Sequence, residues 1–402
     1  MLEQELEIEA IINELKVLPL FNLSLSSKEL FHSNFLAWIC GLYPEILSVV
    51  FADYLKHDVS SCKISNVYRE SEKIDLTLKY SHGETLIIEN KVKSLPDFEQ
   101  LKEYSLKQPN VNFLLLSLIE PNLSSFLKKE KKIIIADKNK QFIWHYLSYY
   151  DLAQKLQEVQ LEIAETNSYH GQLLAEYIQF IKLLYNLSSF FHIKEDENPI
   201  FHNKNIDKLW EIRFRDVIIK LWYSQLMQRL EQRLKVQNFE INENWNEIKK
   251  GQIIFGSGMI NGKGFFEVKY CIKDKTYCPI SDKQIGTPIF LGIQIDNRDF
   301  KILCECEFTD DKTKARKISE QLYSLKEGDK IWFDLSHVPG NAKEFPNRKG
   351  KEFNQYYGTF IYRYKGLKED ILVNDLINLI VKYIFLIKNN QEDIEAMIEK
   401  AW

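Results

Sequence analysis

The chain has 402 residues, more than one hydrophobic core usually serves, so we expect two domains. With 45% hydrophobic and 27% charged residues, its composition is that of a folded globular protein and excludes a disordered or fibrous one. The net charge of −4 gives no global sign of nucleic-acid binding, so any such contact would have to be local.

Two helices are expected at the start of the chain. Apolar residues recur at helical spacing in residues 2–15 and again in residues 28–50. The pattern then changes to two short β-favouring runs, residues 74–78 and 85–89, separated by a turn-like stretch at residues 80–83. These runs predict a β-hairpin or two adjacent strands.

Helices and strands alternate in the rest of this half. Pro96 can occupy a first helical turn and Asp97 favours a helix start, which predicts a helix over residues 96–106. Further strands and helices are expected in this order: strands at 111–117, 132–136 and 142–145, a helix at 149–159 capped by Ser148, and a helical tract at 162–187.

The polar segment 194–205, which contains Pro199, is the most linker-like stretch of the chain. We therefore expect one domain over residues 1–190 and a second over residues 200–402. The second domain is predicted to be α+β, with these elements: one long helix at 206–236, strand-like runs up to residue 364, and terminal helices at 369–387 and 392–401.

Several features bear on the cellular compartment. Four glutamates among the first ten residues argue against a signal peptide, and no apolar run has the length of a membrane span. The six cysteines do not form a secreted disulfide framework. Those of the second half lack the spacing of zinc knuckles, which argues against zinc. A cytoplasmic protein with reduced thiols and no membrane partner is expected.

The expected hairpin carries the strongest candidates for chemistry. Asp75 lies in its first run, while Glu89 and Lys91 project from one face of the second. Phosphodiester hydrolysis needs hard oxygen ligands for Mg²⁺, which Asp75, Glu89 and the backbone carbonyl of Asn90 can supply. An ammonium group such as that of Lys91 can hold the attacking water and stabilise transition-state charge.

Gln100 and Tyr104 stand four residues apart on the expected helix, so both can face the same site. The spacing of Asp75, Glu89 and Lys91 alone is loose enough to recur by chance. Glu267 and Lys269 repeat the Glu-x-Lys pattern in another strand-like run with no such helix after it. We interpret that second pair as a solvated strand face.

Four ordered motifs together point to a family. They read Phe-His-Ser-Asn-Phe-Leu-Ala-Trp at 31–38, Lys-Ile-Asp-Leu at 73–76, Ile-Ile-Glu-Asn-Lys at 87–91 and Gln-Leu-Lys-Glu-Tyr at 100–104. The sequence from about residue 28 to 156 resembles the PD-(D/E)XK nuclease superfamily, most closely bacterial members with His-Ser-x-x-Leu-Ala-Trp and Ile-Glu-Asn-Lys motifs. Ile74 stands where the family often has proline.

The resemblance implies a restriction-endonuclease-like fold, an α/β domain with a mixed central sheet flanked by helices. It implies dependence on Mg²⁺ or Mn²⁺ and cleavage of DNA, with Asp75, Glu89 and Lys91 matching the core. Gln100 and Tyr104 match the following helix motif, and Glu29 matches a glutamate of the first conserved helix that often joins the metal site. Glu70 resembles an acidic position of some relatives, or is only a strand-edge charge.

The sequence therefore predicts a metal-dependent deoxyribonuclease. A role in bacterial defence against foreign DNA would suit such an enzyme. One alternative is a catalytically silent or gated nucleic-acid-binding or sensing module, and another is a nuclease that acts on RNA. A homodimer would pair two active sites across a duplex. In the second domain, the basic loop 345–351 ahead of Tyr356 could bind single strands, although strand packing explains the tyrosine equally well. His32 and Trp38 are expected to serve packing.

Overall fold

The computed structural model describes most of the chain as two compact units. The described residues are 2–25, 28–56, 63–71, 73–121, 123, 125–137, 140–242, 247–260, 263–274, 276–278, 283–285, 288–306, 313–323, 332–340, 352–356 and 359–401. The first unit comprises Met1–His192 and Asn205–Leu221, and the second Ile193–Lys204 and Trp222–Trp402. The chain thus enters the second unit at the expected linker, returns to the first unit, and leaves it again within a helix.

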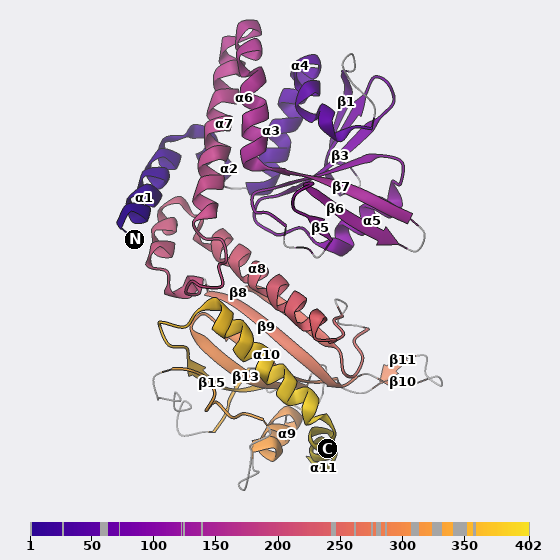
Figure 1. Ribbon diagram of the computed structural model, residues 1–402, viewed down its shortest axis with the longest axis vertical. Helices are drawn as coiled ribbons and strands as arrows, with labels where there is room; N and C mark the ends of the chain where they lie inside the picture. The colour runs from indigo at the N-terminus through magenta and orange to yellow at the C-terminus, as the bar shows by residue number, and fades with distance from the viewer. Residues whose placement is uncertain are drawn as a thin grey trace. The chain divides into compact units, whose positions relative to one another are not determined.

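A seven-stranded mixed sheet forms the centre of the first unit (Figure 1). Its strands are β1 (Ile64–Ser71), β2 (Ile74–Tyr80), β3 (Thr85–Lys91), β4 (Asn112–Ser117), β5 (Phe126–Leu127), β6 (Lys132–Asp137) and β7 (Lys140–Ser148). They lie in the order β1-β2-β3-β4-β7-β6-β5. The β3–β4 and β4–β7 pairs are parallel, and the other pairs are antiparallel. The predicted mixed α/β fold is confirmed.

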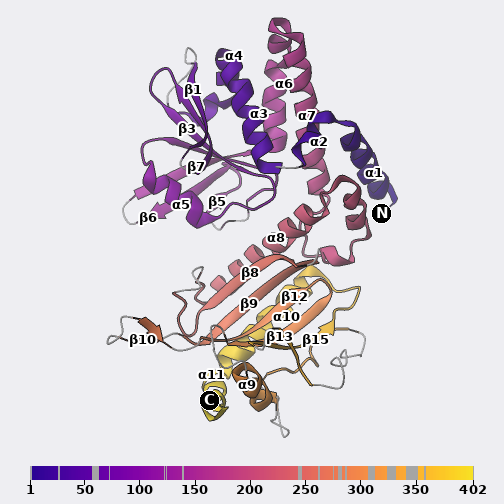
Figure 2. The ribbon, with the colours of Figure 1, turned by 180° about the vertical axis from the view of Figure 1, so that it is seen from behind.

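Helices cover both faces of this sheet. They are α1 (Leu2–Val17), α2 (Pro19–Ser24), α3 (Lys28–Leu42), α4 (Pro44–Ser48), the 3₁₀ helix η1 (Val49–Tyr54), α5 (Phe98–Lys107), α6 (Tyr149–Thr166) and α7 (Ser168–Ser189). Helices α3, α6 and α7 lie on one side of the sheet and α5 on the other, as Figures 1 and 2 show from opposite directions. Leu101 and Tyr104 of α5 pack into a core cluster with Ile87, Phe113 and Trp144 of the strands.

Local chemistry explains where several elements differ from expectation. The second opening helix is broken at Pro44, because proline lacks the N–H that a continuing helix needs. Helix α5 begins at Phe98 and not at Pro96, since the Asp97 carboxylate accepts the N–H groups of Glu99 and Gln100 and so caps the helix. Ser148 caps α6 as predicted.

Two further segments depart from the predicted elements. The expected helix over 206–236 is two elements, η3 (Lys204–Ile212) and α8 (Arg215–Val236). Arg213 between them has φ 51°, a left-handed conformation that no right-handed helix contains. Strand β1 was not predicted from the sequence. Nearly all of its residues are exposed or half-buried, so they show no alternating hydrophobic pattern.

A six-stranded antiparallel sheet forms the second unit and confirms its α+β character. Its strands, in sheet order, are β14 (Asn354–Tyr356), β15 (Phe360–Gly366), β13 (Asp299–Cys306), β12 (Ile289–Asp296), β9 (Lys263–Lys273) and β8 (Ile253–Ile260). Helix α10 (Val373–Asn389) lies across one face of this sheet (Figures 1 and 2). The other elements are η2 (Ile200–His202), α9 (Lys314–Tyr323), α11 (Gln391–Ala401) and the hairpin of β10 (Thr276–Cys278) and β11 (Lys283–Ile285).

The pair Glu267 and Lys269 is not a solvated strand face, and that interpretation was wrong. Lys269 is only 4% exposed, and its Nζ lies 2.7 Å from carboxylate oxygens of both Glu267 and Glu305. Sheet register explains the burial, because β12 lies between β9 and β13 and brings Glu305 across to Lys269. Gln294 and Lys301 extend this polar network on the same face.

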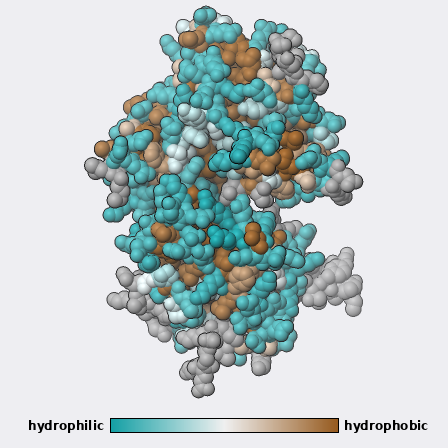
Figure 3. All heavy atoms as spheres, viewed as in Figure 1, coloured by the Kyte–Doolittle hydropathy of each residue, from teal (hydrophilic) through white to brown (hydrophobic). Residues whose placement is uncertain are grey.

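Hydrophilic residues dominate the surface seen in Figure 3, with hydrophobic ones in separate patches. Among the described residues, no single helix is long and apolar enough to span a membrane. One pair of segments, Glu29–Leu42 and Pro44–Tyr54, passes that test only jointly and is bent by 119°. The basic loop 345–351 lies outside the described residues.

Candidate active site

Sheet register brings the two candidate carboxylates together. The β2–β3 hairpin turns through Gly83, whose φ of 97° suits glycine, and pairs Thr77 with Ile87. Asp75 and Glu89 lie two residues beyond this pair on their own strands, so both project from the same face. This is the face that packs against α5, and Lys91 follows Glu89 on it.

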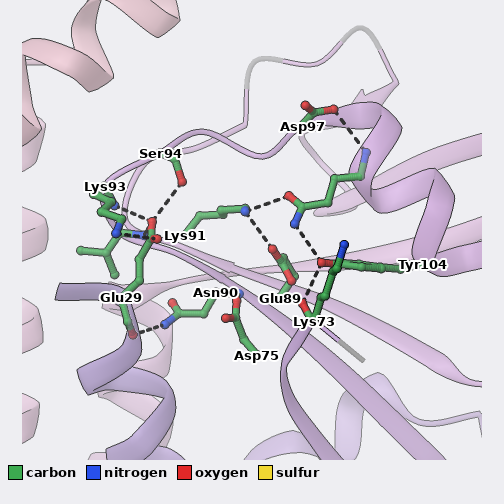
Figure 4. A network of polar contacts seen from close by, with 12 residues as sticks. Glu29, Lys73, Asp75, Glu89, Asn90, Lys91, Lys93, Ser94, Asp97 and Tyr104 are labelled. Atoms are coloured by element: carbon green, nitrogen blue, oxygen red, sulfur yellow. Dashed lines mark hydrogen bonds and ion pairs between the residues drawn. The ribbon is translucent and has the colours of Figure 1, made fainter. Parts of the chain in front are cut away.

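Asp75 is tied to the strand that carries the other two residues. Its Oδ2 accepts a hydrogen bond from the backbone N–H of Asn90 at 2.8 Å. The N–H and C=O of one strand residue point to the same edge of the strand, so the Asn90 carbonyl is directed toward the Asp75 side. The three predicted oxygen donors thus lie around the end of β3 (Figure 4).

A chain of hydrogen bonds orients Lys91. Its Nζ lies 2.8 Å from Glu89 Oε1 and donates to Gln100 Oε1 at 2.9 Å. Gln100 Nε2 donates in turn to Tyr104 Oη at 2.9 Å, and Tyr104 donates to the carbonyl of Lys73 at 2.8 Å. Helix α5 therefore contacts the end of β3 and the residue just before β2, and Figure 4 shows Tyr104 directed toward Lys73. The predicted proximity of Gln100 and Tyr104 to the site is observed.

Burial raises the pKa of both carboxylates. It raises the pKa of Glu89 to about 7, against the opposing effect of Lys91, and Asp75 raises it further. Burial also raises the pKa of Asp75, although the N–H of Asn90 and the charge of Lys91 act in the other direction. For Lys91, burial alone would lower the pKa, but the Glu89 carboxylate outweighs it and the pKa is raised. Negative charge is thus in excess at this site.

These residues fit a divalent cation. Glu89 is 2% exposed, and its Oε2 has no hydrogen-bond partner, so a buried carboxylate oxygen is left with an unused lone pair. Hard oxygen donors of this kind, together with excess negative charge, are what Mg²⁺ and Mn²⁺ bind. Across the part of the chain that the structure describes, no three His, Cys, Asp or Glu side chains form a metal-binding group. The backbone carbonyl of Asn90 is a further oxygen donor beside Asp75.

The side chain of Asn90 points away from the site and joins β3 to the helical layer. Its Nδ2 donates to the Glu29 carbonyl and to Ser33 Oγ, both at 3.1 Å, and its Oδ1 accepts from Tyr149 Oη at 2.5 Å. All three polar positions of the amide are used. The sequence did not single out Ser33 or Tyr149 for this role, because they lie 57 and 59 residues from Asn90 along the chain.

The remaining candidates have other surroundings. His32 is 1% exposed, and its Nδ1 lies 3.1 Å from Tyr177 Oη, which confirms its packing role. Trp38 contacts Phe35 and His170 but keeps 38% of its surface exposed. Glu70 is exposed, with φ 50°. Glu29 Oε1 accepts hydrogen bonds from the residues that follow Lys91, as detailed below.

Comparisons with known proteins agree with the geometry. Residues 19–182 match the family model described as the PD-(D/E)XK nuclease superfamily, and this segment contains the whole of the site described above. Searches of curated proteins and of solved structures found no match. Residues 19–182 of this chain are therefore similar to the PD-(D/E)XK nuclease superfamily in both sequence and fold.

Proposed function

We propose that this protein is a Mg²⁺-dependent deoxyribonuclease that hydrolyses phosphodiester bonds at the end of β3. One observation carries the proposal: Asp75, Glu89 and Lys91 converge there, with the Glu89 Oε2 buried and without a hydrogen-bond partner. Asp75, Glu89 and the Asn90 carbonyl would hold the cation, and Mn²⁺ would serve in its place. When bound, the cation supplies Lewis acidity that activates water and offsets charge on the phosphate.

The residues of the chain have separable tasks. Asp75 and Glu89 supply negative charge that favours cation binding once both are ionised. Lys91 places a compact cation where charge develops on the phosphate, and its ammonium group can orient water. Gln100 holds Lys91 by accepting a hydrogen bond from its Nζ, and Tyr104 holds Gln100 by accepting a hydrogen bond from its Nε2. Gln100 and Tyr104 thereby limit the rotation of the lysine before the substrate arrives.

The test compares plasmid, linear duplex, single-stranded DNA and RNA as substrates in Mg²⁺, Mn²⁺ or EDTA. Wild-type protein is compared with Asp75→Ala and Lys91→Ala, and Glu45→Gln, at an exposed carboxylate that pairs with Lys63, serves as the control. We expect cleavage of DNA that EDTA abolishes and that falls by at least about a hundredfold in both site variants but not in the control. Cleavage of RNA alone would reassign the substrate.

A folded wild-type protein that cuts none of these substrates would contradict the proposal and favour a silent or gated binding module. We extend the proposal to a cytoplasmic enzyme in bacterial defence against foreign DNA. Two copies acting as a homodimer would cut both strands of a duplex. Sedimentation with and without duplex DNA tests the dimer.

A further inference from the structure

One carboxylate near the site makes contacts unlike those of Asp75 and Glu89. Glu29 lies in the first turn of α3, and its Oε1 accepts three hydrogen bonds: from the N–H of Val92 at 3.2 Å, the N–H of Lys93 at 2.9 Å and the Oγ of Ser94 at 3.0 Å. Its Oε2 lies 3.7 Å from Lys93 Nζ. Figure 4 shows Glu29 reaching the backbone directly after Lys91.

Two observations separate Glu29 from the cation. Three donors saturate Oε1, since an ionised carboxylate oxygen offers about two lone pairs. In addition, within the described ranges Glu29 does not complete a group of three acidic side chains with Asp75 and Glu89. The buried oxygen without a hydrogen-bond partner belongs to Glu89, whereas Oε2 of Glu29 faces Lys93 Nζ at 3.7 Å.

The same glutamate holds β3 from a second position. Its backbone carbonyl accepts from Asn90 Nδ2, so α3 contacts the residue before Lys91 through a carbonyl and the residues after it through a carboxylate. Strand β3 ends at Lys91, where the Lys91 carbonyl accepts from Leu118 N–H. The backbone on both sides of the lysine is therefore anchored.

From this geometry we infer that Glu29 is a positioning residue, which holds the turn after Lys91 and so aims the lysine, and that it is not a ligand of the cation. The inference rests on the proposed function for its catalytic consequence. Its structural part, the anchoring of residues 92–94, does not depend on that function.

Glutamine at position 29 separates the two roles. In Glu29→Gln, the amide oxygen can still accept from Val92 and Lys93, while the lost negative charge would weaken a metal ligand. Glu29→Ala removes both properties, and Ser94→Ala removes one donor and leaves the carboxylate in place. Glu45→Gln alters an exposed carboxylate that pairs with Lys63 and serves as the control.

Three measurements on the full chain decide the question: Mn²⁺ binding by electron paramagnetic resonance, amide hydrogen exchange of residues 92–93, and kcat. We expect Glu29→Gln to keep all three within about threefold of wild type. Glu29→Ala should keep Mn²⁺ affinity within the same range, but exchange faster at residues 92–93 and lose about 10- to 100-fold in kcat. Ser94→Ala should fall between the wild type and Glu29→Ala in exchange rate.

A loss of tenfold or more in Mn²⁺ affinity in Glu29→Gln, as in Glu89→Gln, would overturn the inference. Unchanged amide exchange in Glu29→Ala would overturn it as well. If the wild type cleaves nothing, the nuclease proposal fails, while Mn²⁺ binding and amide exchange still decide the role of Glu29.

Discussion

At the scale of single residues, the site is defined by a conflict between burial and charge. Glu89 and Asp75 are both raised in pKa because burial penalises their ionised forms, and Lys91 offsets this only in part. Burial makes the ionised Glu89 carboxylate unfavourable. Binding a proton removes this cost, and binding a cation would remove it as well. Under the proposed function, a proton and the metal would compete for Glu89, so metal binding should strengthen as the pH rises through about 7.

The pKa of Glu89 also predicts how stability depends on pH in EDTA. The folded-state pKa of about 7 lies above the ordinary value of 4.5, so the folded protein binds this proton more tightly than the unfolded chain does. The resulting stabilisation is fully present below pH 4.5 and is lost as the pH rises through 7. The free energy of unfolding of Glu89→Gln relative to wild type should therefore rise by about 2 kcal/mol between pH 5 and pH 8.

Urea unfolding at both pH values measures this difference. Addition of Mg²⁺ at pH 8 should stabilise the wild type and leave Glu89→Gln unaffected, because the variant lacks a carboxylate ligand. If the free energies of unfolding of the two proteins changed in parallel with pH in EDTA, burial would not raise the pKa of Glu89.

At the scale of secondary-structure elements, helix α5 fixes the position of the Lys91 ammonium group through Gln100. Its first turn contains Gln100, and Asp97 caps that turn by accepting the N–H groups of Glu99 at 2.8 Å and Gln100 at 3.2 Å. The cap therefore fixes the backbone of the residue that holds Lys91. We therefore expect stability and activity to be coupled at this helix start, with Asp97 acting on Lys91 through Gln100.

Removal of the cap tests this coupling. Asp97→Ala should lower the free energy of unfolding by about 1 kcal/mol, because two N–H groups lose their acceptor. It should also reduce kcat a few-fold, since Gln100 is less firmly held. Asp97→Asn is the matched control, because asparagine caps helices nearly as well and should restore both quantities. Equal losses in the alanine and asparagine variants would point to the charge of Asp97 and not to the cap.

At the scale of the whole molecule, the chain forms two compact units with separate cores. The candidate site lies entirely within the first unit, so a cation should stabilise that unit alone. Calorimetry of the full chain should show two unfolding transitions, of which Mg²⁺ raises only one. Phe266 is fully buried in the second sheet. Phe266→Ala should therefore lower the temperature of the other transition, with a loss of about 3 kcal/mol in the free energy of unfolding of the second unit.

A single transition that responds to both Mg²⁺ and Phe266→Ala would show that the two units unfold together. Val236, which is 82% exposed, provides the control substitution to alanine, with an expected change in the free energy of unfolding below about 0.5 kcal/mol.

The sequence by itself determined the parts of this protein that depend on short spacings. Asp75, Glu89 and Lys91 lie in one hairpin, where strand alternation and a short turn dictate which side chains share a face. Gln100 and Tyr104 follow from helical spacing, and Ser148 from the preference of serine for helix starts. These inferences needed no knowledge of distant contacts.

Only the tertiary structure decided the contacts between distant segments. Ser33 and Tyr149 bind Asn90 across 57 and 59 residues, and Glu29 reaches Val92 across 63. Glu305 lies across the sheet from Lys269 and pairs with it. The Glu267–Lys269 pair, which the sequence pattern predicted to be solvated, is therefore part of a buried ion pair. Helix and strand periodicity report only on the local backbone, whereas burial and the choice of partner depend on which elements the fold brings together.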